Sequence, residues 1–387
     1  MSTAPGARRG AVEMEFHDLK RQYNALREEI AWRVGKVAEE SRFIGGAEVA
    51  QLEERLAEYV GAKRCITCGS GTDALTLMLA AAGIGRGDAV FVPDFTFFAT
   101  AEAVSRTGAA PLFVQPERDT FNLSPIALRR AIAKAREEGV RARAILAVDL
   151  FGLPADWPQL EEIAAENGLL LFEDAAQGFG GEADGRRACS FGLAAATSFF
   201  PAKPLGCYGD GGAVFTDDEG LAELVRSLRE HGRGENKYEN LRVGCNSRLD
   251  TVQAAVLLAK LEAFRRYELA AVRRAAALYT DGLRGLRATL KTPCQPPGCR
   301  PAWAQYTVRF SGPEERESAM KRLRAAGVPF AIYYPRPVSR QEAYGCGAPE
   351  QTVSDWLCER VLSLPIHPYI TDSEIERVCA ALRGLRL

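Results

Sequence analysis

Short apolar runs alternate with amphipathic segments over the first two thirds of the chain. The pattern predicts a charged helix over residues 17–42 and an amphipathic helix over 47–60. Apolar runs of strand length, separated by helical stretches, follow at 64–67, 89–92, 111–114, 144–148, 169–172, 196–200 and 213–216. These runs predict an α/β fold built on a mostly parallel, seven-stranded sheet with helices on both faces.

The pattern changes after Asp250. Residues 251–283 predict one long helix, in which Phe264 marks the position where it could break. The elements expected beyond it are a Pro- and Gly-rich loop at 292–303, a strand at 305–310, a helix at 314–326, an extended segment at 331–335 and a final helix at 373–385. This mixture predicts a smaller α+β domain at the C-terminal end.

Length and charge narrow the classes of protein. A chain of 387 residues is long enough for two domains, and we expect a large cofactor-binding one over 14–255 and a small one over 256–387. Residues 1–13 are expected to form a flexible leader, and Met14 is an alternative start of translation. The 49 Lys and Arg residues balance 50 Asp and Glu residues, which argues against a nucleic-acid-binding face.

Targeting signals and cysteines add two expectations. No apolar run approaches the length of a membrane span, and the N-terminus has no apolar stretch typical of a secretory signal. We therefore expect a cytoplasmic protein with no membrane or nucleic-acid partner. Cys65 and Cys68 form a C-x-x-C, for which a redox or zinc site is one interpretation. A buried strand end with small apolar side chains is the favoured one, and no metal is expected.

A glycine-rich segment follows the first predicted strand. Gly69-Ser70-Gly71-Thr72-Asp73 opens an apolar helix, where glycines let the backbone approach an anion and the helix N-terminus offers free N–H groups. A phosphate cradle is one interpretation of this segment. The alternative is an ordinary capped helix start.

Two charged side chains stand in surroundings that are unusual for them. Asp174 ends an apolar strand, where a carboxylate is costly unless it pairs with a cation such as a protonated heterocycle nitrogen. Lys203 lies in an apolar, Pro- and Gly-constrained turn after a strand, and a desolvated lysine is a better nucleophile for a Schiff base. The alternatives are a helix cap for Asp174 and a lysine that reaches solvent for Lys203.

An aromatic cluster at 95–98 follows another predicted strand. One of its rings could stack on a planar cofactor, and packing in the core is the alternative. Together, a phosphate cradle, a stacking ring, an Asp for a pyridinium nitrogen and a Schiff-base lysine are the parts of a pyridoxal phosphate site.

The order and spacing of these motifs resemble those of a known enzyme family. The segments that carry the likeness, which extends over residues 14–387, are GSGTDAL, FTFFAT, EDAAQGFG, TSFFPAKPLG, GDGGA and NSRLDTVQAA. The chain resembles the fold type I, pyridoxal-phosphate-dependent aminotransferases that act on nucleotide-linked keto sugars (the DegT-like enzymes). The resemblance implies an aspartate-aminotransferase-like fold, pyridoxal 5′-phosphate as cofactor and glutamate as amino donor.

The resemblance also implies roles for single residues. Lys203 binds the cofactor aldehyde as a Schiff base and later moves a proton, whereas relatives that are dehydratases carry His there. Asp174 pairs with the pyridinium nitrogen, and Gln177 binds the phenolic oxygen. The remaining positions are Gly71, Thr72, Asp73 and Ser198 at the phosphate, Phe97 stacked on the ring, and Asn246 reaching the phosphate of a neighbouring subunit. The last of these implies a homodimer with shared active sites.

The likeness is greatest to enzymes that aminate C3 of a UDP-linked 2-acetamido-3-keto-hexuronic acid, in the synthesis of surface polysaccharides such as lipopolysaccharide O-antigen. The substrate carboxylate needs a cation, for which Arg229, Lys237 and Arg242 are candidates, with solvated surface charge as the alternative. Tyr333 stands where the likeness leads us to expect His.

Two other functions stay open at this point. One is an aminotransferase of the same fold that acts on a nucleotide-linked 4-keto sugar or on another 3-keto deoxy sugar. The other is a non-enzymatic regulator that binds the cofactor. The presence of Lys203, Asp174 and Gln177 argues against the regulator.

Overall fold

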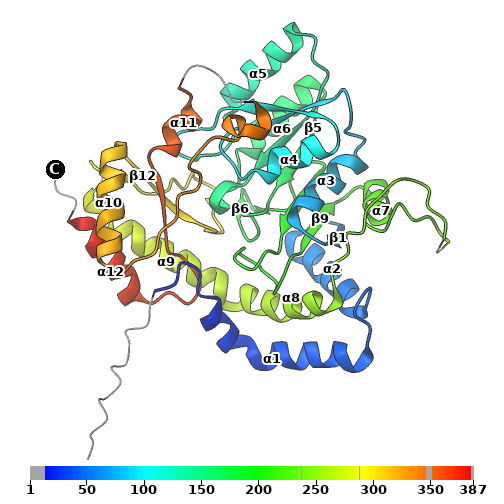
Figure 1. The fold of residues 1–387 in the computed structure, drawn as a ribbon, viewed down its shortest axis with the longest axis horizontal. Coiled ribbons are helices and arrows are strands. Elements are labelled where there is room, and N and C mark those ends of the chain that lie inside the picture. Colours follow the sequence, from blue (N-terminus) through cyan, green and yellow to red (C-terminus); the bar gives the residue numbers. More distant parts are fainter. Residues whose placement is uncertain (1–13, 237, 287, 346–350, 385–387) are drawn as a thin grey trace, which may run out of the picture.

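The computed structural model describes residues 14–236, 238–286, 288–345 and 351–384 (Figure 1). The expected leader, residues 1–13, lies outside the described residues. The helices are α1 Leu19–Glu40, α2 Ala47–Val60, α3 Gly71–Ala81, α4 Ala99–Arg106, α5 Pro125–Glu137, α6 Trp157–Asn167, α7 Glu219–Leu228, α8 Thr251–Ala263, α9 Leu269–Gly282, α10 Pro313–Ala325, α11 Val353–Cys358 and α12 Asp372–Arg383.

The strands form three sheets. The large sheet contains β1 Arg64–Cys68, β2 Ala89–Pro93, β3 Ala110–Val114, β4 Ala142–Val148, β5 Leu170–Asp174, β8 Ala194–Ser198 and β9 Gly212–Thr216. The two three-stranded sheets contain β10 Leu290–Lys291, β12 Tyr306–Phe310 and β13 Val361–Leu364, and β6 Glu182–Ala183, β7 Arg186–Arg187 and β11 Cys299–Arg300. The seven strands expected from the apolar runs are the seven strands of the large sheet.

The large sheet has the order β1-β9-β8-β5-β4-β2-β3. Strand β9 is antiparallel to both of its neighbours, and the other pairs in the sheet are parallel. The α/β class and the mostly parallel sheet are therefore confirmed. Because β1, β2, β5 and β8 run in the same direction, the segments that follow them meet at one edge of the sheet.

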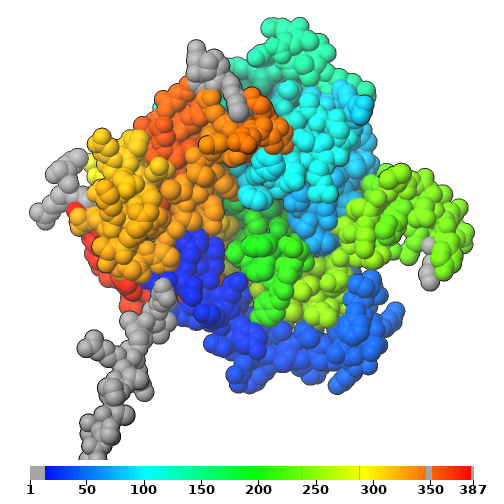
Figure 2. All heavy atoms as spheres, viewed as in Figure 1, coloured from blue at the N-terminus to red at the C-terminus, as the bar shows by residue number. Residues whose placement is uncertain are grey.

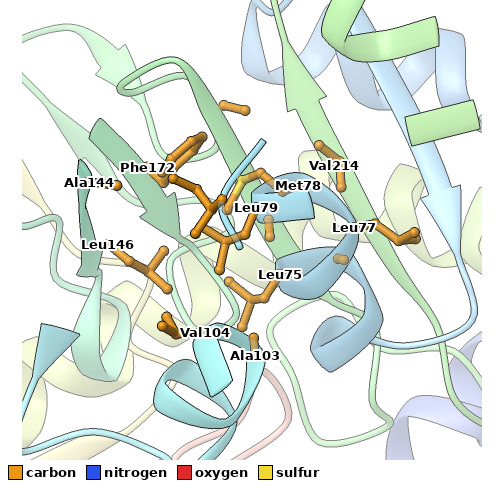
Figure 3. Close-up of a cluster of buried hydrophobic side chains, with 14 of the residues drawn as sticks. Leu75, Leu77, Met78, Leu79, Ala103, Val104, Ala144, Leu146, Phe172 and Val214 are labelled. Carbon is orange, nitrogen blue, oxygen red and sulfur yellow. The ribbon is translucent and has the colours of Figure 1, made fainter. Parts of the chain in front are cut away.

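Side chains alternate between the two faces of this sheet, as the strand period requires. Val214 and Phe172 pack with Leu75 and Met78 of α3 on one face (Figure 3). Helices α4 and α7 cover the same face. Helices α5 and α6 cover one part of the opposite face, and α2 and α8 cover the other. The result is a three-layered body in which the large sheet lies between two layers of helices.

The long helix expected over 251–283 is interrupted where the sequence suggested. Residues Phe264–Glu268 form a π-helical turn between α8 and α9. Helix α8 packs in the core beneath the large sheet, whereas α9 packs with β12, β13 and α12 in the C-terminal core. The packing therefore changes at the π-helical turn, and a domain division at residue 255 stays a prediction.

The C-terminal part contains the expected strand and helices and adds one helix and three strands. Strand β12, helix α10 and helix α12 lie within two residues of their expected starts. Helix α11 and strands β10, β11 and β13 were not anticipated. Strand β13 is fully buried and pairs with β12, so its four residues lack the alternation that marks a half-buried strand. No helix of the described residues is long and apolar enough to cross a membrane.

Candidate active site

The candidate residues gather at the carboxyl edge of the large sheet. Strand β9 separates β1 from β8, and its Gly212 pairs with Cys68 on one side and with Ser198 on the other. Across this short distance Gly71 packs directly on Ser198: a Cβ at Gly71 would lie 2.6 Å from the Ser198 Cβ. The glycine-rich segment and the Lys203 segment are thereby brought together.

Asp174 lies at the end of β5 and is only 4% exposed. Its Oδ2 accepts a hydrogen bond of 2.8 Å from Thr100 Oγ1, and its Oδ1 accepts one of 3.1 Å from the Ala176 N–H. Burial raises the pKa of Asp174, and the Lys203 charge acts in the opposite direction. A carboxylate in this position gains from a cation placed beside it.

Lys203 lies in the turn after β8 and is half-buried. Burial lowers the pKa of its amine, and the Asp174 charge opposes that shift. The side chain lines a cleft to which His17, Trp303 and His367 also contribute. An amine with a lowered pKa is more readily available as a nucleophile.

Gln177 is buried and held at both ends of its amide. Its Oε1 accepts a hydrogen bond of 2.6 Å from the Phe151 N–H, and its Nε2 donates one of 3.0 Å to Tyr334 Oη. An amide nitrogen carries two N–H groups, so Gln177 retains one donor for a ligand. Phe97 is 56% exposed, and its ring lies 6.3 Å from that of Tyr334.

The anion-binding end is built by the start of α3. Ser70 caps the helix through a hydrogen bond from the Asp73 N–H, and the Asp73 carboxylate accepts one of 2.8 Å from Ser247 Oγ. Arg106 lies 3.6 Å from the same carboxylate. Asp73 is therefore occupied within the chain. The first-turn N–H groups of Gly71 and Thr72, which have no acceptor within a helix, stay available.

The segment after α7 projects from the body of the molecule (Figures 1 and 2). It carries Asn246, whose side chain is exposed and whose backbone forms a bridge with Glu230. The neighbouring Ser247 is buried and accepts a hydrogen bond from the Gly69 N–H. Asn246 therefore stands beside the glycine-rich segment and faces solvent.

The three candidate cations of this region have different surroundings. The Arg229 guanidinium is 2.7 Å from Glu53 Oε1 and 2.5 Å from the Thr67 carbonyl oxygen, so it has a structural role within its own subunit. Its Nε has no hydrogen-bond partner among the described residues, and a role for Arg229 at the substrate stays a prediction. Arg242 is exposed and donates to Ser227 Oγ. Lys237 lies outside the described residues.

Sequence reasoning missed several residues that the fold brings to the site. Thr100 and Tyr334 contact Asp174 and Gln177, and the aromatic segments that contain them were the available signal. Arg248 lies two residues after Asn246, and its buried Nε has no hydrogen-bond partner among the described residues. Cys68 is buried, and burial raises its pKa to about 12, as befits a small apolar side chain in β1.

Comparison with known proteins assigns the family. The DegT/DnrJ/EryC1/StrS aminotransferase family matches residues 24–383. This chain belongs to that family. A relative from Pseudomonas aeruginosa named UDP-2-acetamido-2-deoxy-3-oxo-D-glucuronate aminotransferase is 44% identical over 369 residues, which cover 95% of this chain and 99% of the relative. A relative from Acidithiobacillus ferrooxidans named as a 3-aminotransferase of UDP-N-acetyl-3-dehydro-α-D-glucosamine is 38% identical, covering 95% of this chain and 96% of its own.

Solved structures give the same result for the fold and the cofactor. A family member from Brucella abortus superposes with a TM-score of 0.92 at 45% identity, covering 96% of this chain and 99% of its own. NtdA from Bacillus subtilis, solved with bound PMP, superposes with a TM-score of 0.88 at 27% identity, covering 97% and 86%. The protein is an aminotransferase, and its cofactor is pyridoxal 5′-phosphate. The buried Asp174, the free donor of Gln177 and the cradle at Gly71 fit this cofactor.

Proposed function

We propose that this aminotransferase moves an amino group from glutamate to C3 of a UDP-linked 2-acetamido-3-keto-hexuronic acid, in the synthesis of surface polysaccharide such as O-antigen. The observation that carries the choice of substrate is the 44% identity, over nearly the whole chain, to a relative named for that substrate. The enzyme acts in the cytoplasm, where nucleotide-linked sugars are made and used.

The chain's own residues would hold the cofactor from four sides. The N–H groups of Gly71 and Thr72 and the Ser198 hydroxyl bind the phosphate, because they converge at a helix N-terminus. Phe97 stacks on the ring. The Asp73 N–H and carboxylate are hydrogen-bonded to Ser70 and Ser247, and these bonds keep the start of α3 in place. Pyridoxal phosphate supplies an aldehyde that takes up amino groups and a ring that accepts electrons.

Two side chains would govern charge at the ring. Asp174 holds a proton on the ring nitrogen, since a buried carboxylate stabilises a cation beside it. The second N–H of Gln177 Nε2 donates to the phenolic oxygen. Lys203 Nζ provides the amine that holds the cofactor and afterwards carries a proton between the reacting carbons, for which its lowered pKa suits it.

The active unit in this proposal is a homodimer in which Asn246 reaches the phosphate of the second subunit. Its exposed side chain on a projecting segment supports the idea. The same segment would bring cations to the substrate carboxylate. The candidates are Arg229, Lys237 and Arg242, to which the fold adds Arg248. The Nε atoms of Arg229 and Arg248 have no hydrogen-bond partner among the described residues, while Glu53 pairs with Nη1 of Arg229.

An enzyme for a different nucleotide-linked keto sugar is the second candidate, and one position favours it. Tyr333 occupies the place where the likeness to uronate enzymes leads us to expect His. A neutral 4-keto or 3-keto deoxy sugar would need no cation for a carboxylate.

The test is kcat/KM for the UDP-linked 3-keto uronate beside a neutral UDP-4-keto-6-deoxy sugar, with glutamate saturating. Loss of a charge-assisted hydrogen bond costs about 1.5–3 kcal/mol, so we expect the uronate to be favoured roughly 10- to 100-fold. A preference for the neutral sugar would reject the proposed substrate and leave the aminotransferase assignment unchanged.

A further inference from the structure

Two buried acids lie directly behind the candidate site. Asp149 follows β4, Glu173 precedes Asp174 on β5, and both side chains are 0% exposed. The Asp149 N–H donates to the Asp174 carbonyl oxygen at 3.1 Å, which ties the two strand ends together. Two carboxylates buried side by side would repel each other strongly, so their protonation state needs an explanation.

The hydrogen bonds around the pair leave one oxygen without a donor. Asp149 Oδ1 accepts from the Ala155 N–H at 2.9 Å and from Trp157 Nε1 at 3.1 Å. Glu173 Oε1 and Oε2 accept from the N–H groups of Cys189 at 2.7 Å and of Phe191 at 3.0 Å. Among the described residues, Asp149 Oδ2 finds no donor.

A proton on Glu173 supplies that missing donor. Ala147 pairs with Glu173 in the sheet, so Asp149, two residues further along, faces the same side as Glu173. Burial together with the Asp149 charge holds the pKa of Glu173 well above its usual range. A protonated carboxyl donates one hydrogen bond and keeps its capacity to accept others. The neighbouring charged groups are Asp174 and, facing it, Lys203.

The surroundings keep the pair dry and fixed. The indole N–H of Trp157 binds Asp149, and the backbone N–H of Phe191 binds Glu173. The rings of these two residues stack at a centroid distance of 4.9 Å with an angle of 2° between their planes. A Cβ at Gly178 would lie 2.7 Å from Asp149 Oδ2, so only glycine fits against the pair. Gly178 directly follows Gln177, so Asp149 packs against the backbone next to that residue.

Through these contacts the pair controls two side chains of the cofactor site. Asp149 holds the loop at 149–157, and the Phe151 N–H of this loop binds Gln177 Oε1, which aims the Gln177 amide. Glu173 is adjacent to Asp174 in β5. We propose that Asp149 and Glu173 share one proton and act as a positioning pair that aims Gln177 and Asp174 while adding a single negative charge behind the cofactor ring. This rests on the proposed roles of those two residues.

Isosteric amide substitutions test the shared proton, because the proposal fixes the charge of the Asp149–Glu173 pair in the wild type and in each variant. The wild-type pair carries one negative charge. In Asp149→Asn the Glu173 side chain ionises, and in Glu173→Gln the Asp149 side chain stays ionised, so each variant also carries one. The double variant carries none. If both acids were ionised in the wild type, each single variant would already have lost a charge.

Two readouts follow the pair. In the apoprotein at neutral pH, infrared difference spectra should show a protonated carboxyl band in the wild type that both single variants lack. In the holoenzyme, the pH midpoint of the cofactor's visible absorbance band should be unchanged in the single variants and lowered by about one unit in the double variant. A unit charge removed roughly 10 Å away has that effect at an effective dielectric constant of about 20. Asp156→Asn, in the same loop and still a helix cap, is the matched control.

Positioning has its own test. Asp149→Ala releases the loop, and kcat should fall about 100-fold, as expected for a misplacement of about 1 Å, while Asp149→Asn restores most of it. The shared proton is overturned if the single variants keep the protonated carboxyl band. It is also overturned if the pH midpoint of the cofactor absorbance is already shifted in the single variants. The infrared result does not depend on the cofactor, so it separates this inference from the proposed function. If Asp149→Ala does not fold, the amide variants still decide.

Discussion

At Lys203 and Asp174, burial disfavours the charged form of each side chain, whereas the opposite charge of the other residue favours it. Burial lowers the pKa of the lysine and raises that of the carboxyl, and each group offsets part of the other's shift. Asp174 accepts hydrogen bonds from Thr100 and Ala176 but has no ion-pair partner among the described residues, whereas Glu53 pairs with Arg229. Under the proposed function, this difference leaves Lys203 and Asp174 available to the cofactor.

Lys203→Ala should remove turnover and keep cofactor binding, because the phosphate cradle and Asp174 remain. Borohydride reduction of the wild-type holoenzyme followed by peptide mapping should label Lys203. Lys260 offers a matched control, since burial lowers its pKa to about 8 and its amine lies over the Tyr208 ring at 5.3 Å. Lys260→Met should stay active, and a label on Lys260 or Lys134 would reject the assignment.

At the scale of elements, function depends on where strands end and helices begin. Helix α3 starts immediately after β1 with a serine cap, and its first turn packs on the end of β8. Asp174 belongs to β5 itself, two residues beyond the apolar run that predicted the strand. Because β1, β5 and β8 run in the same direction, the segments that follow their carboxyl ends lie at one edge of the sheet and form one candidate site.

Gly71→Ala tests the close approach of α3 to β8. The added methyl group would lie 2.6 Å from the Ser198 Cβ, and overpacking of this kind costs about 1–3 kcal/mol. We expect the Kd for pyridoxal phosphate, measured by spectral titration, to rise roughly 10- to 100-fold. Gly35→Ala, where a Cβ on α1 meets nothing within 4 Å, should leave the Kd unchanged. Equal affinities in both variants would contradict the cradle.

The contact between α1 and α12 predicts a pH dependence of stability. The hydrogen bond from Arg21 lowers the pKa of Glu374 to about 2 from 4.5. Because the folded value is depressed, the pair stabilises the protein above pH 4.5 and loses its effect as the pH falls toward 2. Glu374→Gln keeps the helix cap and removes the charge.

Denaturant unfolding measures the effect of this variant. Glu374→Gln should lower the free energy of unfolding by about 1–2 kcal/mol at pH 7, and its difference from the wild type should shrink steadily below pH 4.5. Asp372→Asn, which breaks the exposed pair with Arg274, is the control and should behave as the wild type. A difference that is constant with pH would exclude the ion pair as its cause.

At the scale of the whole molecule, a cleft beside Lys203 is assembled from distant parts of the chain, and Gly71, Asp174 and Gln177 do not line it. The cleft beside Lys203 takes its walls from the N-terminal segment with His17, the π-helical turn with Phe264, and the C-terminal residues Trp303 and His367. The segment after α7 projects from this body (Figure 2), and Asn246 is an exposed residue at its return to the glycine-rich segment. Under the proposed function, a second copy of the chain completes each site.

Mixing two inactive variants tests the shared site. Lys203→Ala and Asn246→Ala homodimers should each be inactive, and their heterodimer should regain activity, since one of its two sites would combine an intact lysine with an intact asparagine. The measurement is turnover after subunit exchange, with exchange confirmed by native mass spectrometry. No recovered activity despite exchange would contradict a site shared between subunits.

The local pattern of the chain determined the seven strands of the large sheet, the break near Phe264 and the motifs that place Lys203 and Asp174. These features depend on residues close in sequence, where side-chain period and flanking glycines carry the signal. Only the tertiary structure decided the pairing of Gln177 with Tyr334, which are 157 residues apart, and the capture of Arg229 by Glu53. The burial of Asp149 against Glu173 was decided in the same way. Contacts of this kind form when strands pair in the sheet. The local pattern of apolar and polar residues does not specify which distant side chains will then face each other.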